Sequence, residues 1–185
     1  AHVESNTGYF SSYEIQVILS MLRILDNPLQ DIPMAAVLAS PIVGMDDEEL
    51  AQIRSAFKGV SFAQAALSAM AGEDGYEDEK LKAFALVFER LRGAVADTPI
   101  HELLYMMLDE TGFYRYASAM PAGKRRRQNI DMLIEMAAAY EKTSYKGLFH
   151  FVRYIDIQQK YEIDYGEADT AGENDDVVRI MTIHK

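Results

Sequence analysis

The strongest concentration of positive charge in the sequence is a run of four basic residues: Lys124, Arg125, Arg126 and Arg127. Clustered cations of this kind, which we call the basic run, bind the phosphates of nucleic acids. Gly123 precedes the basic run and predicts a flexible approach to such a ligand. The alternative is a solvated helix end whose cations pair with acids such as Asp131 and Glu135. Surface pairs of that kind contribute at most about 1 kcal/mol, and both interpretations stay open at this point.

A second candidate for phosphate contact is the turn at Gly44 and Met45, which precedes a predicted helix. A glycine turn that opens a helix exposes backbone amides at the positive end of the helix dipole, and both attract phosphate. Asp46 and the three acids that follow it would repel a phosphate, and Asp46 has the place of a helix cap. These acids favour a structural turn over a contact with duplex DNA.

Residues that could carry catalysis or hold a metal do not converge in the sequence. The four histidines are scattered, at His2, His101, His150 and His184, without the spacing of metal ligands. No cysteine is present, which excludes disulfides and cysteine nucleophiles. The sequence also lacks a phosphate-binding loop with its glycines and lysine, a strand ending in paired acids and a nuclease motif. We expect no catalytic residue, no bound metal and no cofactor in this chain, and a free-standing helical enzyme finds no support.

The overall composition is that of an ordinary globular domain. Of the 185 residues, 49% are hydrophobic and 25% are charged, which is enough apolar surface for one domain with its own core. The sequence contains no run of about 18 apolar residues, the length that a membrane helix needs. The lack of a leader pattern predicts a cytoplasmic location. The net charge of −11 is opposite to the basicity of general nucleic-acid binders, so any contact with DNA should be local.

Helices must position these candidates, because apolar residues recur with helical spacing through most of the chain. Between Tyr13 and Leu25 they cover nearly the whole circumference, which indicates a helix buried on most sides. Narrower stripes follow: Leu81, Phe84, Ala85, Phe88 and Leu91; Leu103, Leu104, Met107 and Leu108; Ile130, Leu133, Ile134, Ala137 and Ala138; Phe149, Val152, Tyr154, Ile155 and Ile157. We therefore predict an all-α fold of several packed helices.

Capping residues mark the expected helix ends. A capping box is predicted by Ser, Thr or Asp three residues before Glu or Gln, as at Ser11 and Glu14, at Asp46 and Glu49, and at Ser61 and Gln64. Thr98 and Pro99 predict the start of another helix, and Gly112 predicts its end. The glycines and acids of residues 71–79 predict a solvated loop.

Short extended segments at both termini interrupt the helical pattern. We predict an extended lead-in at residues 1–10, a helical body at 11–165, an acidic loop at 166–176 and a buried strand at 177–185. A strand at each end of a helical body is expected where an insertion is taken out of a domain that contains a sheet. Val3 and Val178 should then lie close together.

Several blocks of the sequence resemble one family of DNA motors. Residues 178–185 (VRIMTIHK) resemble the first half of motif V of the UvrD-like helicases, and residues 7–10 with 22–28 resemble the lead into the inserted 2B subdomain. Residues 40–45 parallel the turn before a helix that carries a Gly-Ile-Gly motif in those enzymes. Residues 31–38, 147–151 and 173–178 resemble the AddA branch of helicase/nucleases, although Ala39 stands where that branch usually has arginine.

The resemblance implies a 2B insertion subdomain of an ATP-dependent DNA helicase/exonuclease that acts in double-strand break repair and recombination. It implies that Thr182 and His184 contact DNA, that ATP and Mg²⁺ act in the parent protein, and that an AddB-like subunit is a partner. The 2B subdomain would steer DNA or that subunit, and the fragment alone should be inactive. The alternative is a helical protein-interaction module that never contacts DNA.

Overall fold

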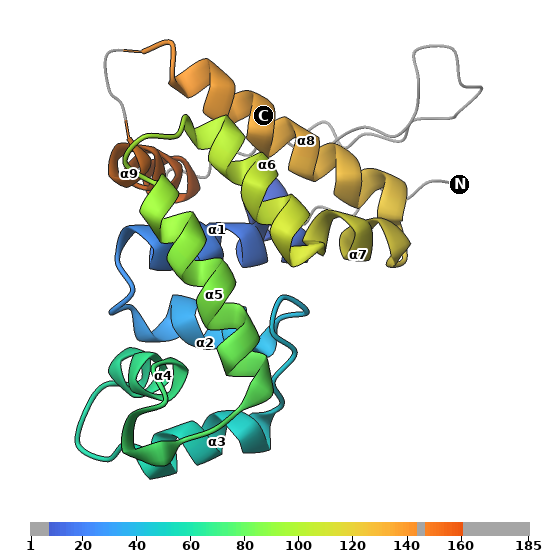
Figure 1. Cartoon of the computed structure of the whole chain (residues 1–185). Helices are drawn as coiled ribbons and strands as arrows, with labels where there is room; N and C mark the ends of the chain where they lie inside the picture. The colour runs from blue at the N-terminus through green and yellow to red at the C-terminus, as the bar shows by residue number, and fades with distance from the viewer. Residues whose placement is uncertain (1–7, 144–146, 161–185) are drawn as a thin grey trace.

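In this computed structural model, residues 8–143 and 147–160 are described. Within them the chain forms α-helices and two single 3-10 turns and no strand, which confirms the predicted all-α fold (Figure 1). The helices are α1 (Tyr13–Asp26), α2 (Asp31–Ala39), α3 (Asp47–Ala56), α4 (Phe62–Met70), α5 (Glu79–Ala94), α6 (Ile100–Thr111), α7 (Phe113–Ala119), α8 (Gly123–Tyr140) and α9 (Leu148–Lys160). The 3-10 turns are η1 (Tyr9–Ser11) and η2 (Glu73–Gly75).

Several predictions concern residues outside the described ranges. They include most of the extended lead-in at 1–10, the acidic loop at 166–176, the strand at 177–185 and the proximity of Val3 to Val178. At the inner edge of the lead-in, residues 9–11 form the 3-10 turn η1 instead of an extended segment. Tyr9 fits this turn because its ring is buried against the helical body and its hydroxyl donates to the Asn129 carbonyl oxygen at 2.9 Å.

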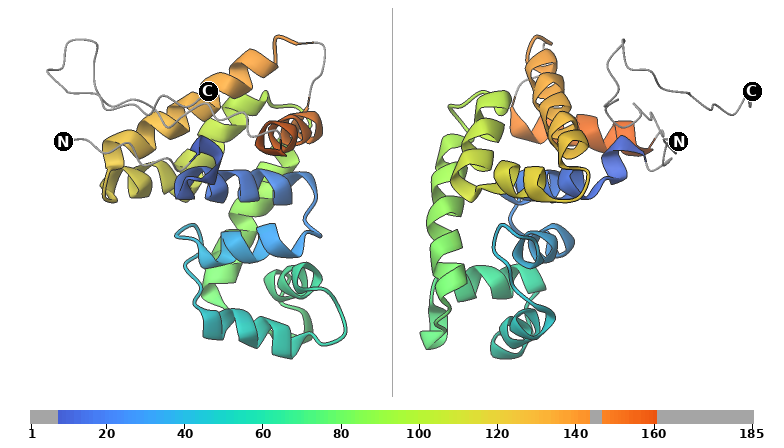
Figure 2. Two further views of the ribbon diagram at one scale, coloured as in Figure 1. Left: turned by 180° about the vertical axis from the view of Figure 1, so that it is seen from behind. Right: turned by 90° about the vertical axis from the view of Figure 1, so that its right-hand side faces the viewer.

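Two groups of helices pack around α1. Helices α2, α3 and α4 form one end of the molecule, α6 to α9 form the other, and the long helix α5 runs along both groups (Figures 1 and 2). Helix α1 contacts α2, α5, α8 and α9. It is therefore the element that joins the two groups, in agreement with its nearly continuous apolar surface.

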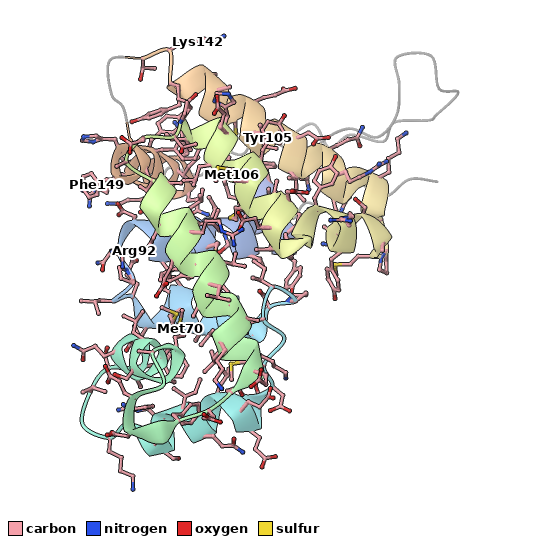
Figure 3. All side chains as sticks on the ribbon, in the orientation of Figure 1. Met70, Arg92, Tyr105, Met106, Lys142 and Phe149 are labelled. Atoms are coloured by element: carbon pink, nitrogen blue, oxygen red, sulfur yellow. The ribbon has the colours of Figure 1, made fainter. Side chains whose placement is uncertain are left out.

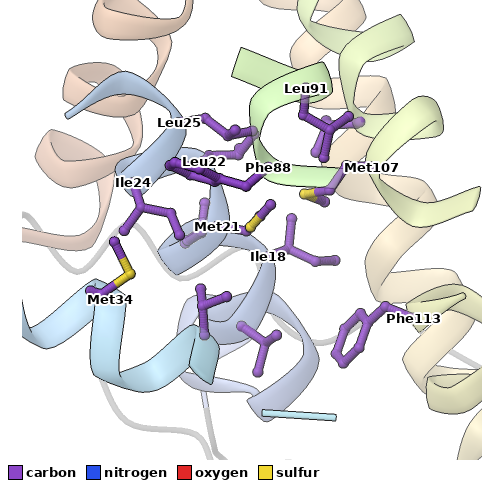
Figure 4. Packing of buried hydrophobic residues seen from close by; sticks show 14 of the residues in the cluster. Ile18, Met21, Leu22, Ile24, Leu25, Met34, Phe88, Leu91, Met107 and Phe113 are labelled. Atoms are coloured by element: carbon purple, nitrogen blue, oxygen red, sulfur yellow. The ribbon is translucent and has the colours of Figure 1, made fainter. Parts of the chain in front are cut away.

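The core lies on the apolar circumference of α1. Met21 of this helix lies beside Phe88 of α5 and Met107 of α6, and Met34 of α2 lies near Ile24 (Figure 4). Met107 is fully buried, while Met106, Met132 and Met136 are partly buried against the core. Flexible thioether side chains fill irregular gaps of this kind, and burying a side chain such as Leu or Met stabilises the fold by roughly 1.5–3 kcal/mol.

Two of the three predicted capping boxes are confirmed. Asp46 accepts from the Glu49 amide at 2.9 Å, and the Glu49 carboxylate accepts from the Asp46 amide at 2.8 Å. Ser61 and Gln64 form the same reciprocal pair.

The box predicted at Ser11 and Glu14 is wrong. Helix α1 begins one residue later, with Ser12 at the N-cap and no side-chain cap. The Ser11 hydroxyl donates to the Gly8 carbonyl oxygen. Glu14 does not cap the helix because its carboxylate is buried and binds Asn129 and Arg126 of α8.

The ends of α6 follow the prediction only in part. Gly112 has a φ of 65° and ends the helix as expected. At the start Pro99 has the N-cap position, which Thr98 was expected to fill, and the cap comes from another part of the chain. The Glu141 carboxylate accepts from the backbone amides of Ile100 and His101 and also contacts the His101 imidazole at 2.6 Å.

The buried face of α9 differs from the stripe predicted for it. Leu148, Phe151, Val152 and Ile155 are buried, whereas Phe149 and Ile157 are about half exposed. The Arg23 guanidinium of α1 and the Asp156 carboxylate form an ion pair at 2.8 Å that is consistent with this orientation. The buried face therefore begins at Leu148 and not at Phe149, where the predicted stripe begins.

Candidate DNA-binding surface

The basic run occupies the first turn of α8. Ala122 precedes the helix with a left-handed φ of 59° and, as alanine, offers no capping side chain. Cations at the N-terminus of a helix oppose the helix dipole and weaken the helix. The run therefore does not stabilise α8 through the dipole, and an anionic ligand would relieve the repulsion.

Gly123 has a packing role and not the flexible one that we expected. A Cβ atom at this position would lie 1.9 Å from the Ser118 carbonyl oxygen of α7. The absence of a side chain allows the start of α8 to lie against the end of α7. The approach to the basic run is consequently held by close backbone packing.

The Arg126 side chain binds partners within the protein. Its guanidinium donates to the Glu14 carboxylate and, through Nε, to the Pro121 carbonyl oxygen at 3.0 Å. Glu14 is 1% exposed and also accepts from the Asn129 side-chain amide at 2.7 Å. Burial, and then the negative charge of Glu14, raise the pKa of the neighbouring Tyr9 hydroxyl. Arg126 thus ties the start of α1 to α8.

The other three members of the basic run are more accessible. Lys124 and Arg127 are exposed and Arg125 is half-buried. Arg125 and Arg126 line a cavity of about 190 Å³, together with Ala122 and residues 11–14 at the start of α1. The structural interpretation paired the run with Asp131 and Glu135, but the Asp131 carboxylate accepts from the Tyr114 hydroxyl at 3.1 Å. Because Arg126 binds Glu14, the candidate phosphate contacts are Lys124, Arg125 and Arg127.

The turn at Gly44 and Met45 is held by internal hydrogen bonds. The Gly44 amide donates to the Ser40 carbonyl oxygen at 2.7 Å, and the Met45 amide donates to the Leu38 carbonyl oxygen at 2.9 Å. The Met45 side chain is buried. The two amides that were expected to meet a phosphate are thus already bonded, and contact with DNA at this turn stays a prediction.

Lys80 fastens the same turn to α5. Its ammonium group donates to the Gly44 carbonyl oxygen at 2.9 Å and to the Glu49 carboxylate at 2.6 Å. The hydrogen bond from Lys80 lowers the pKa of Glu49, and the same bond raises the pKa of Lys80. These contacts make the turn part of the scaffold.

A groove that the sequence did not reveal lies beside the basic run, between α6, α7 and α8. Its volume is about 450 Å³, and it is lined by Tyr105, Leu108, Asp109, Tyr114, Arg115, Asp131 and Ile134. Tyr105, Leu108 and Asp109 share one face of α6, at the spacing of neighbours on a helix. That spacing was visible in the sequence, but the opposing residues of α7 and α8 were not assignable to the same place.

The remaining predicted site residues fall outside this surface. Thr182 and His184 lie outside the described residues. Across residues 8–143 and 147–160, no group of three or more His, Asp or Glu side chains could hold a metal ion. No helix in these same ranges is both long and apolar enough to cross a membrane.

Comparison with known proteins finds close relatives along the whole chain. It is similar to ATP-dependent helicase/nuclease subunits of the A type (AddA) from Anoxybacillus flavithermus, at 44% identity over 186 aligned residues, and from Bacillus cytotoxicus, at 43% over 188. The relative from Bacillus mycoides is 42% identical over 97% of this chain. In each case the chain spans about 15% of the relative's length. No family model matches the chain.

Proposed function

We propose that the chain is the inserted 2B subdomain of an AddA-type helicase/nuclease, because it corresponds along its whole length to one segment of such enzymes. Its role would be to steer DNA, or the partner subunit, while a longer protein unwinds and cuts DNA during double-strand break repair. ATP hydrolysis and nuclease chemistry would belong to other parts of that longer protein.

The observation that carries this proposal is the basic run at the N-terminal end of α8. Three cations there are accessible in a chain whose net charge is −11. Phosphates would be attracted at this point and repelled by the acidic remainder of the surface. A localised attractive site orients a strand more strictly than a uniformly basic surface would.

The scaffold supports such an orienting role. The buried pair of Glu14 and Arg126 fixes α8 against α1, and Gly123 fixes α8 against α7. A contact held by rigid elements loses less entropy on binding than one carried by a loop. The backbone that carries the accessible cations is therefore held in place, although their long side chains can still adapt to a ligand.

The nucleotide and its Mg²⁺ do not fit residues of this chain. The sequence has no phosphate-binding loop, and the described residues hold no group of acids that could bind a metal. We therefore assign neither group to this segment, and we expect the purified chain neither to hydrolyse ATP nor to cut DNA.

A protein-docking role is the alternative, and one observation favours it. Leu29, in the turn before α2, and Ile32, in the first turn of α2, are 54% and 83% exposed. Exposed apolar residues that lie near one another are common in surfaces that bind proteins. In that case the acidic chain would dock a partner and the basic run would not meet DNA.

Salt-dependent binding of a forked duplex tests the proposal. Arg126 is left intact, and Lys124, Arg125 and Arg127 are replaced together by alanine. Each lost phosphate contact should flatten the plot of log affinity against log salt by about 0.9 for duplex DNA, and the loss should be equal for all sequences because phosphates carry no base information. The matched control removes three exposed cations elsewhere: Lys58, Lys82 and Arg90. An unchanged slope in the folded test variant would contradict DNA steering by this surface and favour protein docking.

A further inference from the structure

The groove between α6, α7 and α8 has the shape and chemistry of a binding site. Its floor is apolar, because Leu108 of α6 and Ile134 of α8 are almost completely buried there. Tyr105 stands on one side with 58% of its surface exposed, and Tyr114 of α7 also lines the groove. The volume of about 450 Å³ lies in the range of small-molecule sites, roughly 300–1,000 Å³. Apolar floors with aromatic side chains suit a flat, aromatic ligand.

The polar groups at the rim point to a ligand that carries both hydrogen-bond donors and negative charge. The carboxylates of Asp109 and Asp131 are exposed acceptors. Arg115 lines the groove, and Arg127 lies one helical turn before Asp131 on the same face of α8. Neither arginine forms an ion pair with another residue in the described part of the chain, so both are available to an anion.

The groove continues the basic run along the same helix. Arg127, the last residue of the run, is seven positions before Ile134 on α8, which is about 10 Å along the helix axis. This distance is on the scale of a single nucleotide. A strand whose phosphates contact the run can therefore bring its next base to the groove.

We propose that the groove receives one unpaired nucleotide of a DNA strand, with the base against Tyr105 and a neighbouring phosphate on Arg115 and Arg127. This inference rests on the proposed DNA-steering function and adds a preference for single-stranded DNA. A paired base is stacked inside the duplex, so only an unpaired base can place its flat face on an aromatic side chain. The carboxylates would accept from the amino groups that bases carry at their edges.

A basic side chain of a partner protein is the competing occupant. Two tyrosines and two carboxylates would suit an ammonium or guanidinium group. Arg115, which lines the groove, and Arg127, one helical turn before Asp131 on α8, would repel that cation at close range. The carboxylates would repel a phosphate in the same way, so the nucleotide fits with its phosphate on the two arginines and the amino groups of its base on Asp109 and Asp131.

The test uses the 185-residue chain and oligothymidine strands that contain one 2-aminopurine, a base whose fluorescence falls when it stacks. Binding should quench the probe, and Tyr105→Ala should abolish the quenching and weaken the affinity by roughly 5- to 150-fold, since one base on one aromatic ring contributes about 1–3 kcal/mol. Tyr105→Phe should retain both effects because it keeps the ring. The matched control is Phe149→Ala, which removes an equally exposed ring from α9 on another part of the surface (Figure 3).

The outcomes separate this inference from the proposed function. Binding that responds to the basic run but shows no quenching, and no loss in Tyr105→Ala, overturns the groove and leaves DNA steering intact. Equal affinity for a strand of abasic sites also overturns it. A groove that binds an arginine-rich peptide through Tyr105, and no nucleotide, would assign the site to a protein partner. If replacing Lys124, Arg125 and Arg127 with alanine leaves DNA binding and its salt dependence unchanged, the proposed function itself is contradicted.

Discussion

The pair of Glu14 and Arg126 gives the sharpest prediction about stability. Replacing Arg126 with alanine leaves the Glu14 carboxylate in the interior without its counter-ion. The side chain of Glu14 is 2% exposed and that of Arg126 is 23% exposed, so solvent screens the pair only weakly. Breaking a buried pair by removing one partner costs about 3–5 kcal/mol.

Two features of the site reduce that cost. The Asn129 side-chain amide still donates to Glu14 at 2.7 Å, and the adjoining cavity of about 190 Å³ can admit water to the carboxylate. We therefore expect Arg126→Ala to lower the free energy of unfolding by about 2–4 kcal/mol. For a domain of this size the melting temperature should fall by roughly 5–15 °C.

Urea denaturation followed by circular dichroism provides the measurement. The midpoint should shift while the slope stays constant, which would identify a change in stability and not in compactness. Arg127→Ala removes a neighbouring charge from an exposed side chain of α8 and should change the free energy by about 0.5 kcal/mol or less. Adding Glu14→Gln to Arg126→Ala should recover part of the loss, because the buried charge is then gone. Equal stability of Arg126→Ala and Arg127→Ala would refute the reasoning.

Two further predictions concern glycines and a surface ion pair. Gly123→Ala should destabilise the protein by about 1–3 kcal/mol through overpacking against the Ser118 carbonyl oxygen. Gly93→Ala in α5 should instead stabilise the protein by about 0.5–1 kcal/mol, because a Cβ atom there meets nothing within 4 Å and alanine favours the helix. Thermal melting of the two variants checks this, and a lower stability of Gly93→Ala than of Gly123→Ala would contradict the packing argument. The pKa of Glu49 is lowered mainly by the hydrogen bond from Lys80, so its contribution to stability is present at neutral pH and is lost as the pH falls through the folded pKa. Glu49→Gln should therefore flatten the acid side of the stability profile, and an unchanged profile would show that the pair does not matter.

Features set by neighbours in the sequence could be predicted from the sequence. The helical periods, the capping boxes at Asp46 and Ser61 and the end of α6 at Gly112 all depend on residues within one or two turns of each other. Capping and helix termination could be predicted because the residues that form these contacts are close together along the chain.

Features set by distant partners could not be predicted in the same way. Glu14 has the spacing of a capping box with Ser11, yet its carboxylate is bound by residues 112 and 115 positions away. The cap of α6 likewise comes from Glu141, 41 positions beyond Ile100. In both cases a carboxylate that is buried or partly buried gains more from a tertiary donor than from an amide exposed to water.

Only one part of the candidate site, the basic run, could be predicted from the sequence, because the other part depends on distant partners. The basic run could be read directly because its members are consecutive, but the separate roles of Arg126 and its neighbours depend on where α1 packs. The groove needs side chains from three helices at once, and no single helix shows it.

The position of the basic run is the strongest argument that an anion belongs there. Accessible cations beside a helix N-terminus weaken the helix, and the N-cap residue Ala122 offers no capping side chain. The buried Glu14 holds Arg126 and anchors α8, so one of the four cations contributes to the fold. A run that served stability alone would be better placed at the C-terminal end of α8, where its charges would favour the dipole. Phosphates bound at the N-terminal end would gain from the cations and the dipole together, which is why we propose the DNA-steering role for this turn.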